Sequence, residues 1–356
     1  MKKSFLLIAS LCVALFASAE TTSDSESTEL ESVFNGYYNS IHGLSGDDLL
    51  LAINKIISVH DSLGYNNVRG DRTKADLRSD GTIWDIYSNC SLATSDYCNN
   101  TNYDTETECE CHNREHILPK SWWGGTQDCR YSDLVNVYPT DNATNQKRSA
   151  WCYGDVTSKT WSNSLGTKLG TGKVGNWNGT VFEPIDEYKG DVARVYCYMV
   201  ACYLDRKYNQ GGKGFVVFNY KNSRCGFTDN GLKWMLAWHR LDPVSSKETS
   251  RNTVIRNKQG NRNPFVDFPN LVEYIWGNKK GEKFYVNSAA TVSSGKADAL
   301  KVTTISGLYT EAGRVVCDGE FQIYDLLGRD VTSLNGQLNG IYIVRQGNAV
   351  QKVVVR

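Results

Sequence analysis

The sequence has no net charge, no internal repeat, no H-E-x-x-H motif and no apolar run long enough to cross a membrane comfortably. Its 39 Lys and Arg residues balance 39 Asp and Glu residues. The lack of repeats excludes solenoid architectures, the missing motif disfavours a zinc metalloprotease, and the short apolar runs exclude a downstream transmembrane helix. The neutral charge means that any binding of nucleic acid has to rely on a local basic region.

The N-terminus has the features of a secretory signal peptide. Lys2 and Lys3 form a short basic head, residues 5–16 are apolar, and residues 17–19 (Ala-Ser-Ala) form a small-residue cleavage site. Cys12 is disfavoured as a lipoprotein anchor because the residue before it is a bulky Leu. We therefore exclude residues 1–19 from the fold and expect the chain to be exported.

Cysteine is concentrated in one part of the chain. Nine of the eleven cysteines lie between Cys90 and Cys225. In an exported chain this density predicts disulfides, up to four in this region, with a connectivity that the sequence does not reveal. A zinc site is the alternative, because soft ligands are closely spaced here. Those ligands are Cys109, Cys111, His112, His116 and Cys129.

Periodicity and composition predict an α+β domain over residues 33–280. The preceding residues, 20–32, are acidic and rich in Ser and Thr, which is typical of a flexible arm. Apolar residues recur at three- and four-residue steps in several segments, as in amphipathic helices. Helices are expected at residues 44–63, 190–208, 232–240 and 245–258, a loop at 259–265, and strands and loops held by cysteines at 80–112.

The chain ends in a second, smaller domain. Residues 281–299 have the composition of a linker. Residues 300–356 then alternate short β-prone runs with Gly-containing turns, which predicts a small all-β domain. Its strands are expected at residues 314–316, 321–324, 341–344 and 350–355.

One stretch of the main domain carries the residue types needed for metal-assisted hydrolysis. Glu115 and His116 are adjacent, and Asn145 lies downstream. Carboxylate and amide oxygens suit Mg²⁺, and an imidazole can act as a general base near neutral pH. Hydrolysis of a phosphodiester needs such a base and neutralisation of the developing charge. The sequence therefore predicts Glu115 and Asn145 as metal ligands and His116 as the general base.

Two arginines are candidates for neutralising further charge on a phosphate. They are Arg148 and Arg130, which flank the predicted site in the sequence together with Lys120 and Lys147. A second basic group occupies residues 251–262. These clusters provide the local positive charge that the neutral chain lacks as a whole.

Each site residue also has an ordinary structural interpretation. A Glu-His pair can be part of any strand, and Asn145 suits the start of a helix. Adjacent residues on a regular strand point to opposite faces, so Glu115 and His116 can serve one site only if the strand ends or bends there. Pro119, close behind, favours an end.

Several motifs, in this order, resemble the endonuclease I family of bacterial secreted and periplasmic nucleases. The resemblance covers most of residues 44–278. The motifs are residues 113–122 (NREHILPKSW), 132–134 (SDL), 138–140 (YPT), 145–149 (NQKRS), 182–184 (FEP), 189–194 (KGDVAR), 242–244 (DPV) and 259–265 (QGNRNPF). The family often has His at the positions of Val135 and Asn136, and Asn at that of Ala150, so rate and sugar preference do not follow from the resemblance.

The resemblance implies a ββα-metal (His-Me finger) core, in which two antiparallel strands and a helix hold one divalent ion. It implies that Glu115 and Asn145 match the metal ligands and His116 the general base, with Mg²⁺, or else Mn²⁺ or Ca²⁺, as the ion. The implied reaction is hydrolysis of DNA, and often RNA, with little sequence preference and with 5′-phosphate ends. The alternatives are a non-catalytic nucleic-acid-binding protein or adhesin on a nuclease scaffold, and a phosphodiesterase for small nucleotides.

The last residues resemble the C-terminal sorting domain of the type IX secretion system. The residues that carry this resemblance are 323–329 (IYDLLGR), 339–344 (NGIYIV) and 352–356 (KVVVR). It implies recognition by the secretion machinery and export through the periplasm and across the outer membrane, with removal of this module and release, or attachment at the outer cell surface. A small β-sandwich binding module is the alternative. We expect the mature protein to be a monomer.

Overall fold

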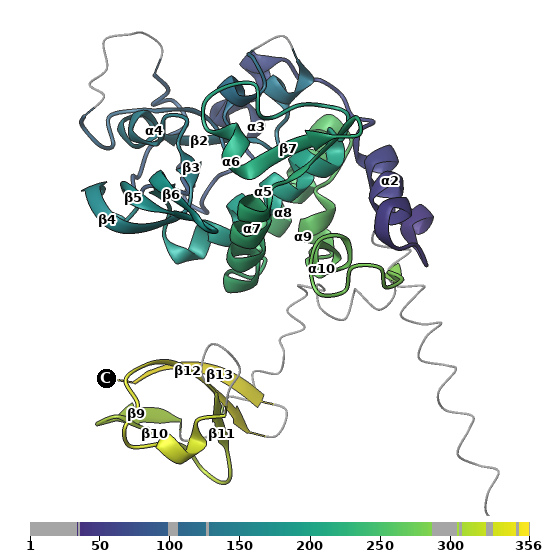
Figure 1. The fold of residues 1–356 in the computed structure, drawn as a ribbon. Helices are drawn as coiled ribbons and strands as arrows, with labels where there is room; N and C mark the ends of the chain where they lie inside the picture. Colours follow the sequence, from purple (N-terminus) through teal and green to yellow (C-terminus); the bar gives the residue numbers. More distant parts are fainter. Residues whose placement is uncertain are drawn as a thin grey trace, which may run out of the picture. The chain divides into compact units, whose positions relative to one another are not determined.

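The computed structural model describes residues 34, 36–98, 106–125, 128–286, 305, 308–324, 330–346 and 349–355. The predicted signal peptide, the predicted acidic arm and residues 287–299 of the predicted linker lie outside the described residues. The chain divides into two compact units between Ser293 and Ser294. This division falls within the predicted linker (Figure 1). None of the described helices has both the length and the apolar character needed to span a bilayer.

The first unit is an α+β structure in which helices outnumber strands. Its α-helices are α2 (Gly46–Ile57), α3 (Gly70–Thr73), α4 (Asn142–Arg148), α5 (Lys189–Cys202), α6 (Gly214–Val217), α7 (Asp229–Leu241), α8 (Ser246–Gln259), α9 (Pro264–Asp267) and α10 (Leu271–Ile275). Short 3₁₀ helices are η1 (Asn39–Ile41), η2 (Tyr65–Asn67), η3 (Lys120–Trp122), η4 (Cys129–Ser132) and η5 (Asp186–Tyr188). The four predicted helices are confirmed as α2, α5, α7 and α8, with shifted ends.

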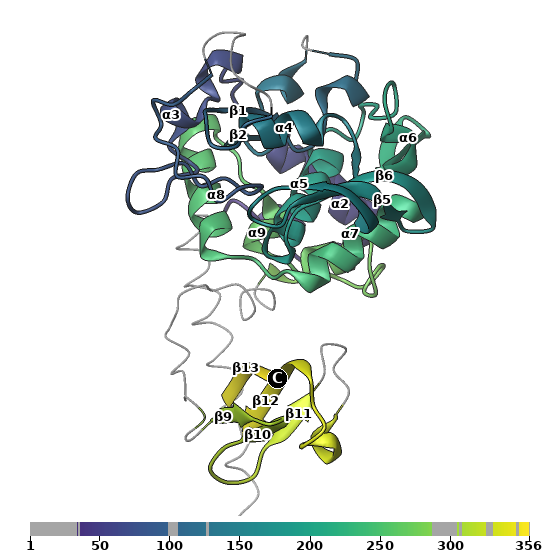
Figure 2. The ribbon, with the colours of Figure 1, turned by 90° about the vertical axis from the view of Figure 1, so that its left-hand side faces the viewer.

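Helix α5 is the centre of the core. The sequence predicted one apolar face, but all fourteen residues of α5 are buried. It packs against α2, α7 and α9, which surround it in Figures 1 and 2. Its Arg194 is neutralised by α8: the guanidinium donates two hydrogen bonds of 2.6 Å to the Glu248 carboxylate. Glu248 also completes a capping box with Ser245 at the start of α8.

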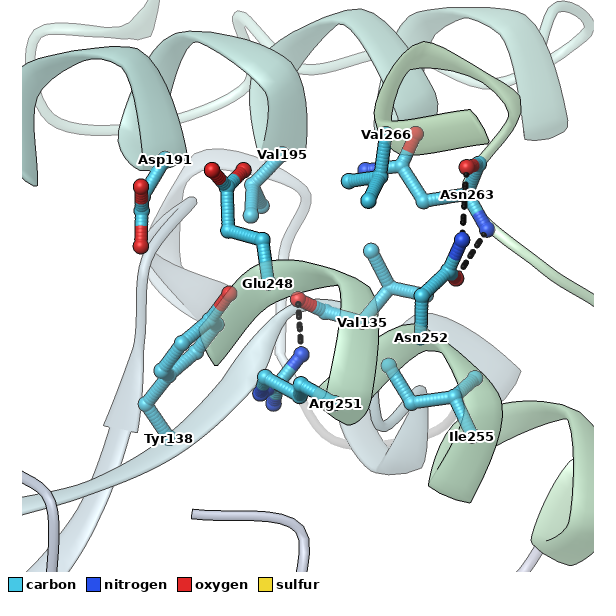
Figure 3. Close-up of a pocket in the computed structure, with 10 residues that line it drawn as sticks. All are labelled: Val135, Tyr138, Asp191, Val195, Glu248, Arg251, Asn252, Ile255, Asn263 and Val266. Atoms are coloured by element: carbon cyan, nitrogen blue, oxygen red, sulfur yellow. Dashed lines mark hydrogen bonds between the residues drawn. The ribbon is translucent and has the colours of Figure 1, made fainter. Parts of the chain in front are cut away.

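A small cavity of about 10 Å³, the size of one water molecule, lies between α5, α8 and the loop before β2. Figure 3 shows Asp191 and Glu248 on one side of it and Asn252 hydrogen-bonded to Asn263 on the other. Burial, and then the neighbouring Glu248 carboxylate, raise the pKa of Asp191 well above its ordinary value. This shift favours the neutral form of the Asp191 carboxyl group, which lessens the repulsion between two adjacent buried carboxyl groups.

Three small sheets complete the first unit. The largest has the order β3-β6-β5-β4, in which β3 runs parallel to β6 and the other pairs are antiparallel. Its strands are β3 (Cys152–Tyr153), β4 (Asp155–Ser162), β5 (Lys168–Val174) and β6 (Trp177–Glu183). The other two are the hairpins β1 (His112–His116) with β2 (Val137–Asp141) and β7 (Phe218–Lys221) with β8 (Arg224–Phe227).

The segment before β1 differs from its prediction. Strands were expected within residues 80–112, but the described part of this segment before β1 forms loops with isolated bridges only. Two disulfides, Cys90–Cys109 and Cys98–Cys111, hold these loops. The cross-links take the place of a regular hydrogen-bonded ladder, so the chain here needs no strand periodicity. Cys111 directly precedes β1, which ties the cross-linked loops to the hairpin.

The second unit is a small β structure, described here by itself. Its strands are β9 (Tyr309–Glu311), β10 (Arg314–Val316), β11 (Gln322–Tyr324), β12 (Gly340–Gln346) and β13 (Ala349–Val355), with the 3₁₀ helix η6 (Thr332–Leu334). The antiparallel pairs are β9–β10 and β11–β12–β13. The predicted strands are confirmed. The core residues are Ile305, Val315, Ile323, Leu338, Val344, Val353 and Val355.

Candidate functional site

The hairpin β1–β2 and the helix that follows it, α4, bring the predicted site residues together. Glu115 pairs with Tyr138 and His116 with Val137 in a regular antiparallel register. Helix α4 begins directly after β2, and its N-cap, Asp141, accepts a hydrogen bond from the Thr144 amide. The short connection forces α4 to fold back against the hairpin.

Helix α4 packs against the face of β1 that carries Asn113 and Glu115. The Asn113 amide donates to Asn142 Oδ1 over 2.7 Å and accepts from Asn145 Nδ2 over 2.5 Å. The Arg148 guanidinium Nε lies 2.8 Å from Glu115 Oε1. Because side chains three residues apart share a helix face, Asn142, Asn145 and Arg148 all point at the same side of β1. Glu115 and Asn145 therefore lie on one face of the strand.

Glu115 is a buried carboxyl group with two polar partners on one oxygen. Besides Arg148, the Tyr87 hydroxyl donates to Oε1 over 2.9 Å. The Tyr153 hydroxyl contacts that of Tyr87, so the carboxyl group is backed by a small aromatic cluster. Burial raises the pKa of Glu115 from 4.5 to about 7, and Arg148 and Tyr87 oppose that rise. The carboxyl group is thus poised between its neutral and ionised forms near neutral pH.

His116 points to the opposite face of β1. Its Nε2 lies 3.0 Å from the carbonyl oxygen of Tyr131, and its ring stacks on the Tyr131 ring with a centroid separation of 5.1 Å. A carbonyl oxygen only accepts hydrogen bonds, so Nε2 carries the proton and Nδ1 holds the lone pair. Burial lowers the pKa of His116 from 6.5 to about 4, and the cations Lys120, Arg114 and Arg148 lower it further. The imidazole is neutral at pH 7.

The predicted strand end is found at His116, the last residue of β1. The register is regular up to that residue, so Glu115 and His116 point to opposite faces as strand geometry requires. Arg148 connects the two faces: its guanidinium pairs with Glu115, donates to the Ile117 carbonyl over 2.7 Å, and acts on the pKa of both Glu115 and His116.

Asn145 is fixed through its amide nitrogen. Nδ2 donates to Asn113 Oδ1 and, over 3.3 Å, to the Arg114 carbonyl oxygen of β1. Both contacts use the nitrogen, so the oxygen Oδ1 is the end of the side chain that can act as a ligand or acceptor. Asn145 is the fourth residue of α4 rather than its cap, which is Asp141. The interpretation of Asn145 as a helix cap is therefore wrong.

The two predicted arginines lie in different surroundings. Arg148 is fully buried on the Glu115 face. Arg130 is held by Asp128 over 2.7 Å and by the Lys207 carbonyl over 2.9 Å, with its guanidinium over the rings of Trp123 and Tyr208. It approaches the His116 side only through Trp123, whose ring meets the His116 ring edge-on.

Two arginines of the basic group at residues 251–262 are paired within the fold, whereas Arg256 and Lys258 are exposed. Arg251 is buried, pairs with Asp76 over 2.9 Å, and donates to the carbonyls of Leu134 and Val137. Figure 3 shows its guanidinium reaching the loop before β2. Arg262 is paired with Asp267. Lys120 is exposed, and its ammonium group lies 5.5 Å from the centre of the Tyr131 ring, so it supplies positive charge beside the site.

Sequence reasoning missed four contributors to the site. Asn113 was detectable, because strand alternation places it on the same face as Glu115. Tyr87, Tyr153 and Tyr131 gave no signal: the first lies in an irregular loop, the second in a two-residue strand and the third in a 3₁₀ turn. Only the folded chain brings their hydroxyl or carbonyl groups to Glu115 and His116.

Two of the cysteines near the site form disulfides, which argues against the zinc site considered from the sequence. Cys109 and Cys111 are both disulfide-bonded, so the zinc site considered from the sequence loses two of its thiolates. The Cys109 amide donates to Asp141 Oδ1 over 2.9 Å, which docks the cross-linked loop on the start of α4. Of the four bridges that the sequence allows, the described residues form two.

Comparison with known proteins places the first unit in a family. Residues 45–270 match the family model of Endonuclease I. The "Extracellular ribonuclease" of Bacillus subtilis (strain 168) is 31% identical over 247 residues, which cover 67% of this chain and 78% of that protein. The "Endonuclease-1" of Buchnera aphidicola subsp. Baizongia pistaciae is 24% identical, over 61% of this chain and 88% of that protein.

The family match spans the hairpin β1–β2, α4 and the core helix α5 that supports them. The chain belongs to the Endonuclease I family and is a nuclease.

Proposed function

We propose that the protein is a secreted, divalent-metal-dependent endonuclease that hydrolyses DNA and RNA without sequence preference and leaves 5′-phosphate ends. The observation that carries this proposal is the arrangement of α4 against β1, which collects Glu115 and Asn145 on one strand face beside a neutral imidazole at the strand end. The names of the relatives support this proposal: "Extracellular ribonuclease" supports RNA as a substrate and export from the cell, and "Endonuclease-1" supports cleavage within a strand.

The order β1, β2, α4, with both strands antiparallel and the helix folded back on them, supports a ββα-metal (His-Me finger) core. For the second unit, we propose that it acts as the sorting signal for export by the type IX machinery, with the mature protein released or held at the cell surface.

Nucleases of the Endonuclease I family generally depend on a divalent metal. The residues present fit such an ion, because Glu115 offers a carboxylate oxygen and Asn145 an amide oxygen from one face, both of the hard type that Mg²⁺ prefers. A bound ion would supply charge neutralisation at the phosphate and at the leaving oxygen. The pKa of about 7 at Glu115 makes binding of the ion compete with a proton.

His116 serves as the general base in this proposal. Its Nε2–H is held by the Tyr131 carbonyl, which fixes the tautomer and directs Nδ1 as the basic nitrogen. The stacked Tyr131 ring and the surrounding cations keep the imidazole neutral, so it can accept the proton of an attacking water at pH 7. The phosphate would lie across the end of β1, where the two faces of the strand meet.

Arg148 holds the Glu115 carboxyl group and the backbone after β1 in place. We propose that it positions Glu115 and offsets negative charge near the phosphate. Arg130 acts further out, by fixing Trp123 behind His116.

The proposal is tested with a supercoiled plasmid. Nicking and then linearisation are expected with Mg²⁺, and both are expected to stop in excess EDTA and return when Mg²⁺ is restored. The product ends should accept a ligase without prior phosphorylation, because water attack that releases the 3′-oxygen leaves a 5′-phosphate. A long RNA should also be cut. Cleavage that persists in EDTA, or ends with 5′-hydroxyls, would reject the mechanism, and binding without cleavage would favour the adhesin alternative.

Tyr87→Phe should lower the cleavage rate at pH 7 by about fivefold, the value of one hydrogen bond of about 1 kcal/mol. The Tyr87 hydroxyl favours the ionised form of Glu115, so its loss raises the pKa of the carboxyl group further. The rate should recover when the pH is raised above 8. Tyr188→Phe is the matched control, because that hydroxyl bonds only Trp84 among the described contacts. A deficit that does not change with pH would contradict the explanation.

A further inference from the structure

A second group of metal-ligating side chains lies away from Glu115 and Asn145. His60 follows the end of α2, Asp133 follows η4, and Cys202 is the last residue of α5. One nitrogen, one carboxylate oxygen and one sulfur of these residues all lie within 4.8 Å of one another. The His60 Nε2 to Asp133 Oδ2 distance is 3.9 Å, and the three side chains are almost completely buried. Three elements that are distant in sequence thus converge on one point.

The imidazole of His60 is oriented as a ligand. Its Nδ1 lies 3.3 Å from the Asp61 carbonyl oxygen, which can only accept, so Nδ1 carries the proton and Nε2 holds the lone pair. Nε2 faces the Tyr203 hydroxyl at 3.1 Å. That hydroxyl already gives its one proton to Asp133 Oδ2, over 2.7 Å. In this tautomer the Nε2 lone pair receives no hydrogen bond from Tyr203, and a cation placed between Nε2 and Asp133 Oδ2 would be bound by both.

Asp133 is held rigidly by groups behind it. Its Oδ1 accepts hydrogen bonds of 2.9 Å from the Val135 amide and from Gln259 Nε2, and its Oδ2 accepts from the Tyr198 hydroxyl as well. Asn261 in turn donates to the Tyr198 hydroxyl. Such outer contacts orient the carboxylates of metal sites and set their geometry before the ion arrives.

We propose that His60, Asp133 and Cys202 bind one divalent cation of the Zn²⁺ class, at a site separate from the catalytic one. Nitrogen, sulfur and carboxylate ligands together suit Zn²⁺ better than Mg²⁺ or Ca²⁺. Zinc bonds of about 2.0–2.3 Å separate tetrahedral ligands by roughly 3.3–3.8 Å, so shifts of less than about 1 Å close the site. The fourth position is open to water or to the exposed thiol of Cys129 in η4.

Metal binding exchanges one proton. Burial raises the pKa of the Cys202 thiol well above its ordinary value, so without metal the thiol keeps its proton and donates to the Ile57 carbonyl. The cation displaces that proton to solvent, and a thiolate–metal bond replaces the S–H bond. The ion then ties the ends of α2 and α5 to η4, whose Tyr131 carbonyl holds His116.

Cobalt is the probe, because Co²⁺ replaces Zn²⁺ and reports its ligands in its absorption spectrum. The full-length mature protein, stripped of metal by chelation and dialysis, is titrated with Co²⁺. One equivalent should give a thiolate-to-cobalt charge-transfer band in the near ultraviolet and intense tetrahedral bands in the visible. The proposed catalytic ligands are oxygens only, so an ion bound there gives no sulfur band. One equivalent of Zn²⁺ should remove the signal.

Cys202→Ser and His60→Gln test the ligands, and Cys197→Ser is the matched control. Cys197 is another buried thiol of α5, but its sulfur contacts Met235. The sulfur band should vanish in Cys202→Ser, weaken and shift in His60→Gln, and persist in Cys197→Ser. Zinc should raise the melting temperature of the wild type and of Cys197→Ser only. Absence of the band, its survival in Cys202→Ser, or a disulfide between Cys129 and Cys202 found by mass spectrometry would overturn the proposal.

Discussion

His116→Ala is expected to lower the rate of phosphodiester cleavage by about 10²–10⁴-fold, the usual contribution of a general base. The Tyr131 carbonyl fixes Nε2 as the protonated nitrogen, so the substitution removes the basic Nδ1. The fold should survive, because His116 is the last residue of β1 and its hydrogen bond, to the Tyr131 carbonyl, lies at the end of the strand. Initial rates of plasmid nicking at saturating Mg²⁺ measure the loss, and circular dichroism checks the fold.

His42→Ala is the matched control for this prediction, since His42 lies in the same unit beside Tyr285 and far along the chain from β1. Its rate should equal that of the wild type. Near-full activity in His116→Ala would remove His116 from the mechanism.

His116 should also affect how the stability of the fold depends on pH. The pKa of His116 is lowered in the fold from 6.5 to about 4, so the unfolded chain binds the proton more readily. The contribution to stability is therefore complete above about pH 6.5 and is lost as the pH falls towards 4. Melting curves between these values should show a steeper decline for the wild type than for His116→Ala.

The sequence predicted the helices well where one face alone is buried. Helix α2 has Leu49, Ile53 and Ile57 buried at four-residue steps, which is the pattern that periodicity detects. Helix α5 was placed correctly, but its complete burial was not expected, because charged residues such as Arg194 and Asp191 usually lie at protein surfaces. They are buried because Glu248, on a helix distant in sequence, neutralises the guanidinium, and no local pattern reveals such a partner.

The sequence predicted the site residues that are recognisable by residue type, such as carboxylates, amides and imidazoles. It did not predict the tertiary contacts that set their pKa values and orientations. Glu115 and Asn145 were identified as residue types, and the fold brings them to one face. Burial raises the pKa of Glu115 to about 7, and the hydroxyl of Tyr87, which contacts that of Tyr153, opposes the rise. These two tyrosines come from an irregular loop and a two-residue strand. Tertiary contacts of this kind are invisible to periodicity and spacing.

Glu115→Gln is expected to lower the cleavage rate at pH 7 by about 10²–10³-fold, because an amide cannot supply the negative charge that holds a divalent ion. Without the ion, the negative charge that develops at the phosphate is not neutralised. Glutamine keeps the shape of the side chain and an oxygen that can accept from Tyr87 and Arg148. The loss therefore reports charge rather than packing. Rates are measured over a range of Mg²⁺ concentrations, and an unchanged Mg²⁺ response would contradict the assignment of Glu115 as a ligand.

The wild type should show a matching acid limb in its pH–rate profile. At low Mg²⁺ the rate should rise through about pH 7, where Glu115 loses its proton. More Mg²⁺ should move this limb to lower pH, since metal and proton compete for one carboxylate. The limit of that movement is the pKa of His116, about 4, below which the base is protonated. A limb that stays in place as Mg²⁺ rises would assign it to another group.

Stability gives an independent check on Glu115 with no metal present. Its pKa in the fold lies above the ordinary value of 4.5, so the folded state holds the proton more tightly than the unfolded chain. The contribution to stability is complete below about pH 4.5 and is lost as the pH rises through 7. Glutamine has no proton to lose, so in EDTA the melting temperature of Glu115→Gln should rise relative to that of the wild type as the pH increases over this interval. If instead the melting temperature of the wild type rises relative to that of Glu115→Gln as the pH rises, the fold stabilises the ionised carboxylate. Arg148 would then outweigh burial in setting the pKa of Glu115.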